Sequence, residues 1–132
     1  MPPRPAVVAL ALLAACADPP PRADGTPVPP EHATAAAYFG ERCTQCHGER
    51  GEGNAYGPAL APWLALDSLP RDARLREATE RGLVLPAGAT PQYLSPAMPP
   101  TGPLQAVERT RLIAYLQWQR ATPPPAAAPP AP

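Results

Sequence analysis

The sequence contains no lysine, and this absence, together with an even balance of charge, excludes one class of partner. All eleven basic residues are arginines, and eleven acidic residues match them, so the 132-residue chain has no net charge with neutral histidines. Proteins that track a nucleic acid need a surplus of basic side chains to neutralise phosphates. Neither a basic run nor a basic excess is present, so we expect no nucleic-acid partner.

Large aromatic side chains are also scarce. The chain has one Phe, four Tyr and two Trp. A small domain buries a smaller share of its surface than a large one, and a core short of large residues needs another apolar body to fill it. The composition therefore predicts that something other than side chains completes the core.

Proline, by contrast, is abundant and gathers toward both ends of the chain. Of 24 prolines, six lie in residues 19–30 and six in residues 123–132, where no apolar period would let the segment bury surface. We therefore expect one domain over residues 31–121, a proline-rich linker over 16–30 and a disordered Pro/Ala-rich tail over 122–132. In polyproline geometry, at about 3.1 Å per residue, residues 17–30 would form a semi-rigid spacer of up to about 40 Å.

The first fifteen residues have the pattern of an export signal. Arg4 precedes ten uninterrupted apolar residues, which as a helix span only about 15 Å of the roughly 30 Å hydrocarbon core of a membrane. The run Leu-Ala-Ala-Cys at residues 13–16 resembles the lipobox of bacterial lipoproteins, in which the chain is cut before the Cys and that Cys is lipid-modified. The resemblance implies an exported, periplasmic or extracytoplasmic protein anchored to a membrane at Cys16. An ordinary secretory signal cut at a nearby small residue is the alternative.

The motif C-T-Q-C-H at residues 43–47 is the most informative pattern in the chain. Two thiols three residues apart, followed by an imidazole, form the attachment signature of c-type haem. Each thiol can bond one vinyl group of the haem, and the imidazole can bind the iron. The motif therefore indicates one covalently bound haem c on Cys43 and Cys46, with His47 as an iron ligand.

Three other interpretations of the cysteine pair stay open. A thioredoxin-like redox pair requires a strand, a turn and a helix beside a parallel sheet, and the sequence shows no such pattern. A zinc site requires four ligands, and the mature domain adds only His32 to the motif itself. A structural disulfide would suit an oxidising compartment. Because export and the C-x-x-C-H spacing agree with each other, the haem site is favoured.

With these residues the sequence resembles the class I monohaem cytochromes c over most of residues 32–121. In that family the second iron ligand is a Met sulfur from a downstream loop, often followed by proline. The resemblance gives this role to Met98, which precedes Pro99; a gap-filling core methionine is the alternative, and His32 is the spare candidate ligand. It also implies an all-α, small cytochrome c fold, with three main helices and proline-rich loops wrapped around one covalently bound haem.

The apolar pattern agrees with three helices. A first helix is expected over 32–46, a middle helix over 70–81 with Gly82 as its stop, and a C-terminal helix around 112–116. The resemblance implies that Phe39 crosses Leu112 and Tyr115 at the small residue Ala35. Residues 83–103 contain six prolines and predict a loop across the distal face of the haem.

A further match concerns the ring of His47. The run Gly-Pro-Ala-Leu at residues 57–60 resembles the family's loop in which a Pro carbonyl accepts a hydrogen bond from the His Nδ1. The resemblance gives this role to Pro58, and a generic turn proline is the alternative. Three aromatic residues, Tyr56, Trp63 and Tyr93, are candidates to bind the haem propionates, and the sequence does not choose among them.

These expectations point to electron transfer. An iron with both axial positions filled offers no place to a small-molecule substrate, so its accessible reaction is the gain and loss of one electron. We expect a membrane-tethered carrier at the outer face of a bacterial membrane, serving membrane-bound or periplasmic redox proteins. Mitochondrial-type relatives dock through a ring of lysines, which this chain lacks, so an apolar docking surface is expected.

Two other classes of function remain. If Met98 does not hold the iron, an open iron position would suit a peroxidase-like haem enzyme or a gas sensor. A peroxidase-type site needs a positioned acid/base group, however, and no distal base is evident, because His32 is the only spare histidine. A haem-free structural lipoprotein would require the cysteine pair to be coincidental.

Overall fold

The computed structural model describes residues 21–84, 92–95 and 97–126. The predicted signal peptide, Cys16 and residues 127–132 of the predicted tail lie outside these ranges. Within the described ranges, no helix combines the length and the apolar character needed to span a membrane.

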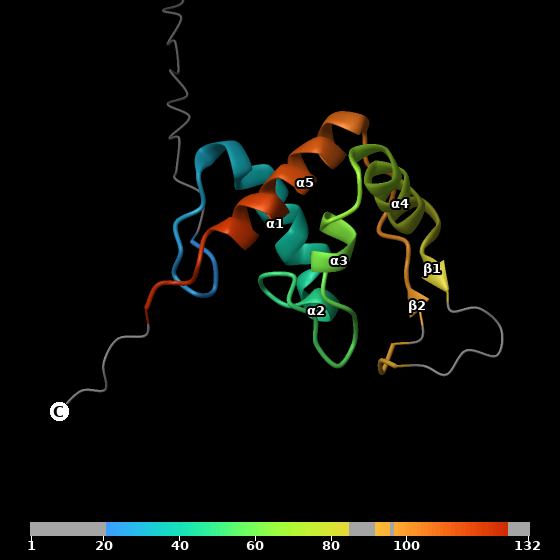
Figure 1. Cartoon of the computed structure of the whole chain (residues 1–132), viewed down its shortest axis with the longest axis horizontal. Helices are drawn as coiled ribbons and strands as arrows, with labels where there is room; N and C mark the ends of the chain where they lie inside the picture. The colour runs from blue at the N-terminus through green and yellow to red at the C-terminus, as the bar shows by residue number, and fades with distance from the viewer. Residues whose placement is uncertain (1–20, 85–91, 96, 127–132) are drawn as a thin grey trace, which may run out of the picture.

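Helices make up most of the described structure (Figure 1). The three longest are α1 (Ala33–Arg42), α4 (Ser68–Arg81) and α5 (Ala106–Ala121). Shorter helices are the 3-10 turn η1 (Pro30–His32), α2 (Thr44–His47) and α3 (Ala61–Leu64). Two short strands, β1 (Leu83–Val84) and β2 (Ala97–Met98), pair in the antiparallel direction after α4.

The core forms where α1 meets α5 (Figure 1). Phe39 is only 1% exposed, and its ring meets Tyr115 edge-on with 6.0 Å between the ring centres. Leu112 and the small Ala35 belong to the same buried cluster. The predicted helix crossing at these four residues is thus confirmed.

The middle helix α4 also follows the predicted pattern, although it starts two residues earlier than expected. Ala78 and Thr79 are buried, and the helix ends at Gly82, whose φ of 73° suits glycine. Arg109 of α5 donates to both carboxylate oxygens of Asp72, at 2.7 and 3.1 Å, and so fastens α5 to α4.

The predicted first helix over 32–46 is wrong in one respect, because it is divided at Cys43. The backbone of Cys43 has φ −122° and ψ −34°, which ends α1, and α2 begins at Thr44. The Cys43 carbonyl then accepts hydrogen bonds from the backbone N–H groups of Cys46 and His47. The haem motif therefore occupies its own helical turn after a break, rather than the last turn of one long helix.

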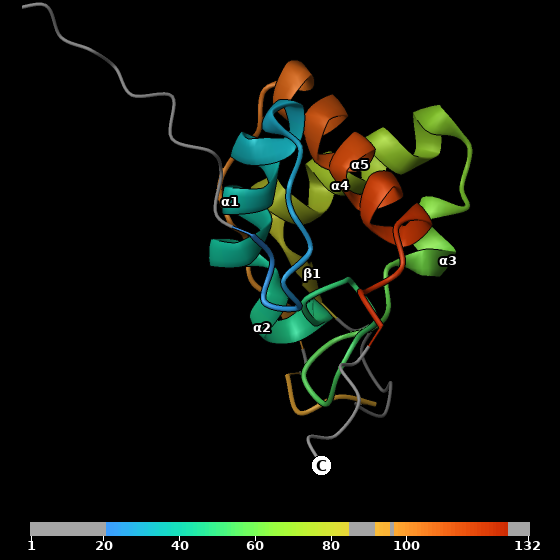
Figure 2. The ribbon, with the colours of Figure 1, turned by 90° about the vertical axis from the view of Figure 1, so that its left-hand side faces the viewer.

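The prediction of a spacer over residues 17–30 is wrong for residues 21–30, which fold against the domain. Arg22, Thr26 and Val28 are buried, and Val28 belongs to the α1/α5 core cluster. A turn at Gly25, with φ 80°, lets the Arg22 N–H donate to the Thr26 carbonyl and folds the segment against α1 (Figure 2). The folded unit therefore includes residues 21–30, because buried Val28 and the ion pairs of Asp24 with Arg22 and Arg50 offset the ordering cost of this short segment.

Candidate functional site

A mainly apolar cavity of about 500 Å³ lies beside the α1/α5 core. Its walls include apolar side chains of α1, α3, α4 and α5, such as Phe39, Trp63, Leu75 and Leu112. The predicted site residues Cys43, His47, Pro58 and Met98 also line it, although they are up to 55 residues apart in the sequence. Arg74 is the one charged side chain among the lining residues described.

The two cysteines of the motif are half-buried and are not joined in a disulfide. Burial, and then the neighbouring Cys46, raise the pKa of the Cys43 thiol to about 11. Redox-active cysteine pairs instead carry a thiol of lowered pKa, so the surroundings of Cys43 do not favour the thioredoxin-like interpretation. In the described parts of the chain, no three His, Cys, Asp or Glu side chains converge as a metal-binding group.

His47 is the last residue of α2 and is 8% exposed. Its ring Nδ1 lies 2.8 Å from the carbonyl oxygen of Pro58, which is the contact that the sequence led us to expect. A carbonyl can only accept, so this bond places the ring proton on Nδ1 and leaves the lone pair on Nε2. The bond therefore fixes both the tautomer and the orientation of an imidazole that borders the cavity.

The loop between His47 and Pro58 is closed by backbone hydrogen bonds. The Gly53 N–H donates to the His47 carbonyl at 2.7 Å, and the Leu60 N–H donates to the Gly51 carbonyl at 2.8 Å. At Gly57 a Cβ atom would stand 2.7 Å from the Cys46 carbonyl oxygen, so this position requires a residue without a side chain. The close approach brings the Pro58 carbonyl within reach of the His47 ring.

Met98 reaches the cavity through the β1/β2 pair. Met98 pairs with Leu83, which follows α4 directly. A Cβ atom on Gly82 would lie 2.4 Å from the Met98 carbonyl oxygen, which is far inside normal contact. Gly82 therefore both ends α4 and allows the Met98 backbone to approach; sequence reasoning recognised only the first of these roles.

The other candidate residues separate into one near the cavity and several away from it. Trp63 lines the cavity, but its Nε1–H donates to the Arg71 carbonyl at 3.2 Å. Neither Tyr56 nor Tyr93 is among the lining residues. His32 is also absent from the lining and packs instead against Trp118, with 5.4 Å between the ring centres.

The residues around the cavity fit a covalently held haem. Cys43, Met98 and His47, whose Nδ1 is already bonded to Pro58, line one apolar cavity. The second free thiol, that of Cys46, stands at the motif spacing from Cys43 but is not among the lining residues. Soft sulfur and imidazole donors are those that hold haem iron in c-type cytochromes. An apolar wall suits the body of a porphyrin. The scarcity of aromatic residues predicts that a group other than side chains completes the core, and a porphyrin would be such a group.

Comparison with known proteins identifies the family. The family model Cytochrome c matches residues 33–120, which is two thirds of the chain. The chain belongs to the cytochrome c family, and this membership implies a covalently bound haem c and a role of the electron-carrier kind. No curated protein and no solved structure matches the chain significantly.

Proposed function

We propose that this protein is a class I monohaem cytochrome c that carries single electrons between redox proteins at the outer face of a bacterial membrane, and that His47 and Met98 would hold its haem iron. The observation that carries the proposal is that the imidazole of His47 and the side chain of Met98 line the same cavity as Cys43. When bound, the haem supplies an iron that accepts and releases one electron.

The residues of this chain would set the properties of that site. The Pro58 carbonyl polarises the His47 ring and makes Nε2 a better ligand. A thioether ligand favours ferrous iron, and an apolar wall disfavours the extra charge of ferric iron. We therefore expect a reduction potential on the positive side of the range of haem proteins.

Two measurements test this function. Haem staining after denaturing electrophoresis should show colour on the polypeptide, because thioether bonds survive denaturation. A spectroelectrochemical titration of the holoprotein should show one reversible step that transfers one electron. A polypeptide without bound haem, or an iron that turns over peroxide instead of cycling reversibly, would contradict the proposal.

The membrane attachment is a part of the proposal that rests on the sequence pattern ending at Cys16. Because Arg22 is buried in the folded unit, only residues 17–21 separate it from the proposed anchor. Six Cα-to-Cα steps span at most about 20 Å, half of the reach expected for a free spacer over residues 17–30. The domain would thus stay close to the bilayer, and a mass measurement of the mature N-terminus would detect the acyl chains on Cys16.

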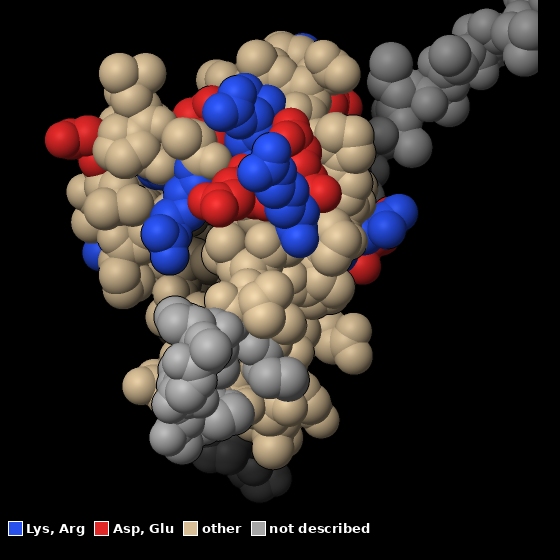
Figure 3. Space-filling model, turned by 90° about the vertical axis from the view of Figure 1, so that its right-hand side faces the viewer, with Lys and Arg blue, Asp and Glu red and all other residues tan. Residues whose placement is uncertain are grey.

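Electron transfer by this protein is expected to depend weakly on salt. Exposed residues that line the cavity are apolar, as at Pro58, Ala59 and Pro62, apart from Arg74. On the face shown in Figure 3, arginines and acidic residues are interspersed, and α4 itself carries four arginines and three acidic residues. Because the surface carries no excess of one charge, electrostatic steering of a redox partner should be weak. Electron-transfer rates measured between 10 and 300 mM salt should therefore change less than about threefold. A steep fall with ionic strength would contradict an apolar docking surface.

Replacing Gly82 with Ala should displace Met98. The new Cβ would meet the Met98 carbonyl, and the φ of 73° is itself unfavourable for alanine. We expect a lower reduction potential and a weakened bond of the methionine to iron, measured by the titration above and by the optical spectrum of the ferric protein. Gly40→Ala is the matched control, because a Cβ at Gly40 would contact nothing within 4 Å, so that variant should keep the parent potential.

A further inference from the structure

An N-terminal strap, residues 21–28, lies against the domain but outside the part that the family model matches. Arg22 is 8% exposed, Thr26 is 7% exposed and Val28 is 6% exposed. The Arg22 guanidinium also stands 5.7 Å from the centre of the Trp118 ring of α5. The strap is thus an ordered addition of this chain to the family domain.

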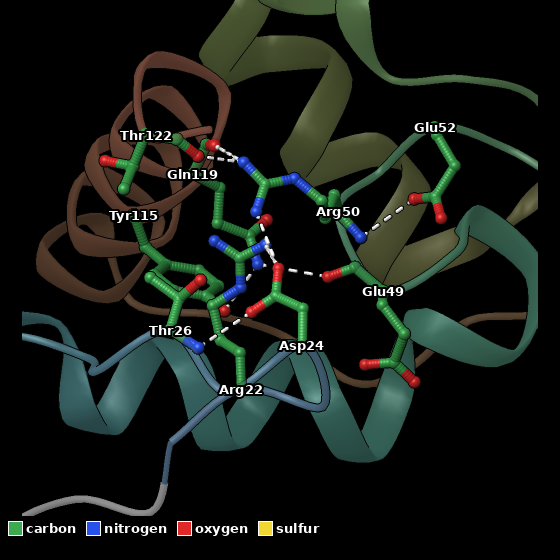
Figure 4. A network of polar contacts seen from close by, with 9 residues as sticks. All are labelled: Arg22, Asp24, Thr26, Glu49, Arg50, Glu52, Tyr115, Gln119 and Thr122. Atoms are coloured by element: carbon green, nitrogen blue, oxygen red, sulfur yellow. Dashed lines mark hydrogen bonds and ion pairs between the residues drawn. The ribbon is translucent and has the colours of Figure 1, made fainter. Parts of the chain in front are cut away.

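Arg50 joins three separate segments (Figure 4). Its Nη1 donates to Asp24 of the strap at 2.7 Å. Its Nη2 donates to the backbone carbonyls of Gln119, at 2.7 Å, and of Thr122, at the end of α5. Cationic groups are favoured there, because the carbonyl end of a helix carries a partial negative charge. Arg50 itself stands only three residues after His47.

A second bond holds the same short stretch. Gln119 is fully buried, and its Nε2 donates to the Glu49 carbonyl at 3.1 Å. In the loop between His47 and Pro58, Glu49 and Arg50 are therefore both bonded to α5, and Arg50 is also bonded to the strap. From this point the loop continues to Gly51, whose carbonyl bonds Leu60, and to Pro58, whose carbonyl bonds the His47 ring.

Asp24 is central to the network because it neutralises two cations. Its Oδ2 accepts from Arg22 at 2.8 Å and from Arg50 at 2.7 Å, while its Oδ1 accepts from the Thr26 N–H. Hydrogen bonds from Thr26, together with those from Arg50 and the charge of Arg22, lower the pKa of Asp24 to about 2. Without this carboxylate, two arginines would face each other at low exposure, and the strap would lose its main tie to the loop.

We infer that Asp24 and Arg50 are positioning residues for the proposed iron ligand His47: the strap and α5 together hold the loop that presents the Pro58 carbonyl to the His47 ring. This inference rests on the proposed function, in which His47 binds the iron. The contacts of Arg50 and Glu49 hold the loop at these two residues, and the loop holds the Pro58 carbonyl against the His47 ring. Loss of either residue frees the loop and exposes the Nδ1 proton to solvent.

The ion pair of Asp72 with Arg109 provides a matched control. It also joins two segments far apart in sequence, with a bond of 2.7 Å, but it fastens α4 to α5 and has no contact with residues 47–58. Asp24→Asn and Asp72→Asn each remove one carboxylate charge without changing side-chain size. A purely structural role would therefore affect both variants alike.

The test is the hydrogen-exchange rate of the His47 Nδ1 proton, measured by NMR on the reduced holoprotein. We expect exchange at least tenfold faster than in the parent for Asp24→Asn and for Arg50→Ala, and within twofold of the parent for Asp72→Asn. Arg50→Lys should fall between Arg50→Ala and the parent, because a single ammonium cannot reproduce the forked contacts of a guanidinium. Urea unfolding of each variant shows how much stability it has lost.

Equal exchange rates in Asp24→Asn and Asp72→Asn, or a parent rate in Arg50→Ala, would overturn the inference. A failure of the proposed function looks different. In that case the parent holoprotein would lack the strongly shifted ring resonances of a histidine bound to iron, whatever the variants show.

Discussion

Met98→Ala is expected to lower the reduction potential and to open the iron to carbon monoxide. Among the described residues that line the cavity, Met98 and Cys43 carry a sulfur atom, and alanine in place of Met98 offers no donor atom. Axial ligands set haem potentials over a range of about 0.8 V, so losing the thioether should lower the midpoint by roughly 0.1 V or more. A spectroelectrochemical titration measures the shift, and a carbon monoxide titration of the reduced variant measures the open position.

Leu83→Ala is the control for this prediction. Leu83 pairs with Met98 and lines the same cavity, but it carries no donor atom. The Leu83→Ala variant should lose the contacts of the Leu83 side chain in the cavity wall. Its iron should nevertheless stay closed to carbon monoxide. If Met98→Ala kept the parent potential and stayed closed, another residue would be the ligand and the assignment of Met98 would be wrong.

The double variant Cys43→Ala, Cys46→Ala is expected to lose both the haem and the stable fold. Without thioether bonds the haem is not retained covalently, and the cavity of about 500 Å³ is left without its apolar content. Because the cavity is open to solvent, its apolar walls would then face water, at about 25 cal/mol per Å² of exposed apolar surface, or several kcal/mol in total. The whole folding free energy of a small domain is about 5–15 kcal/mol, so the haem-free chain should have little or no native state. Circular dichroism and urea unfolding measure the loss.

Met98→Ala serves as the control for the double variant, because it keeps both thioether bonds and therefore the apolar body of the haem. It should stay folded while the double variant does not. A haem-free double variant with the parent's helix content and a cooperative urea transition would show that side chains alone complete the core.

Residues with a strong local pattern were predictable from the sequence. The crossing of Phe39 with Leu112 and Tyr115 came from the family resemblance, and the buried cluster between α1 and α5 confirms it. The end of α4 at Gly82 followed from the helix-stop preference of glycine. The hydrogen bond of His47 with Pro58 came from a family resemblance, because a spacing of eleven residues does not by itself bring two atoms together.

Other features depended on contacts that the sequence does not encode locally. The prolines of residues 17–30 predict a semi-rigid, extended spacer, whereas the fold of the strap against the domain comes from Val28 and from the bonds of Asp24 with Arg22 and Arg50. The β1/β2 pair that places Met98 has two residues in each strand, which is too short to show a period. Arg50 gave no signal at all, because its partners lie 26 and 69 residues away.

Carbon monoxide binding to the reduced parent holoprotein decides whether the iron has an open position. If His47 and Met98 both bind the iron, as proposed, the protein exchanges electrons and binds no small molecule there. We therefore expect no change in the absorption spectrum of the reduced haem after carbon monoxide is added at neutral pH. Rapid, stoichiometric binding would contradict this expectation, because an iron that accepts carbon monoxide at once has an open position and suits an enzyme or a gas sensor.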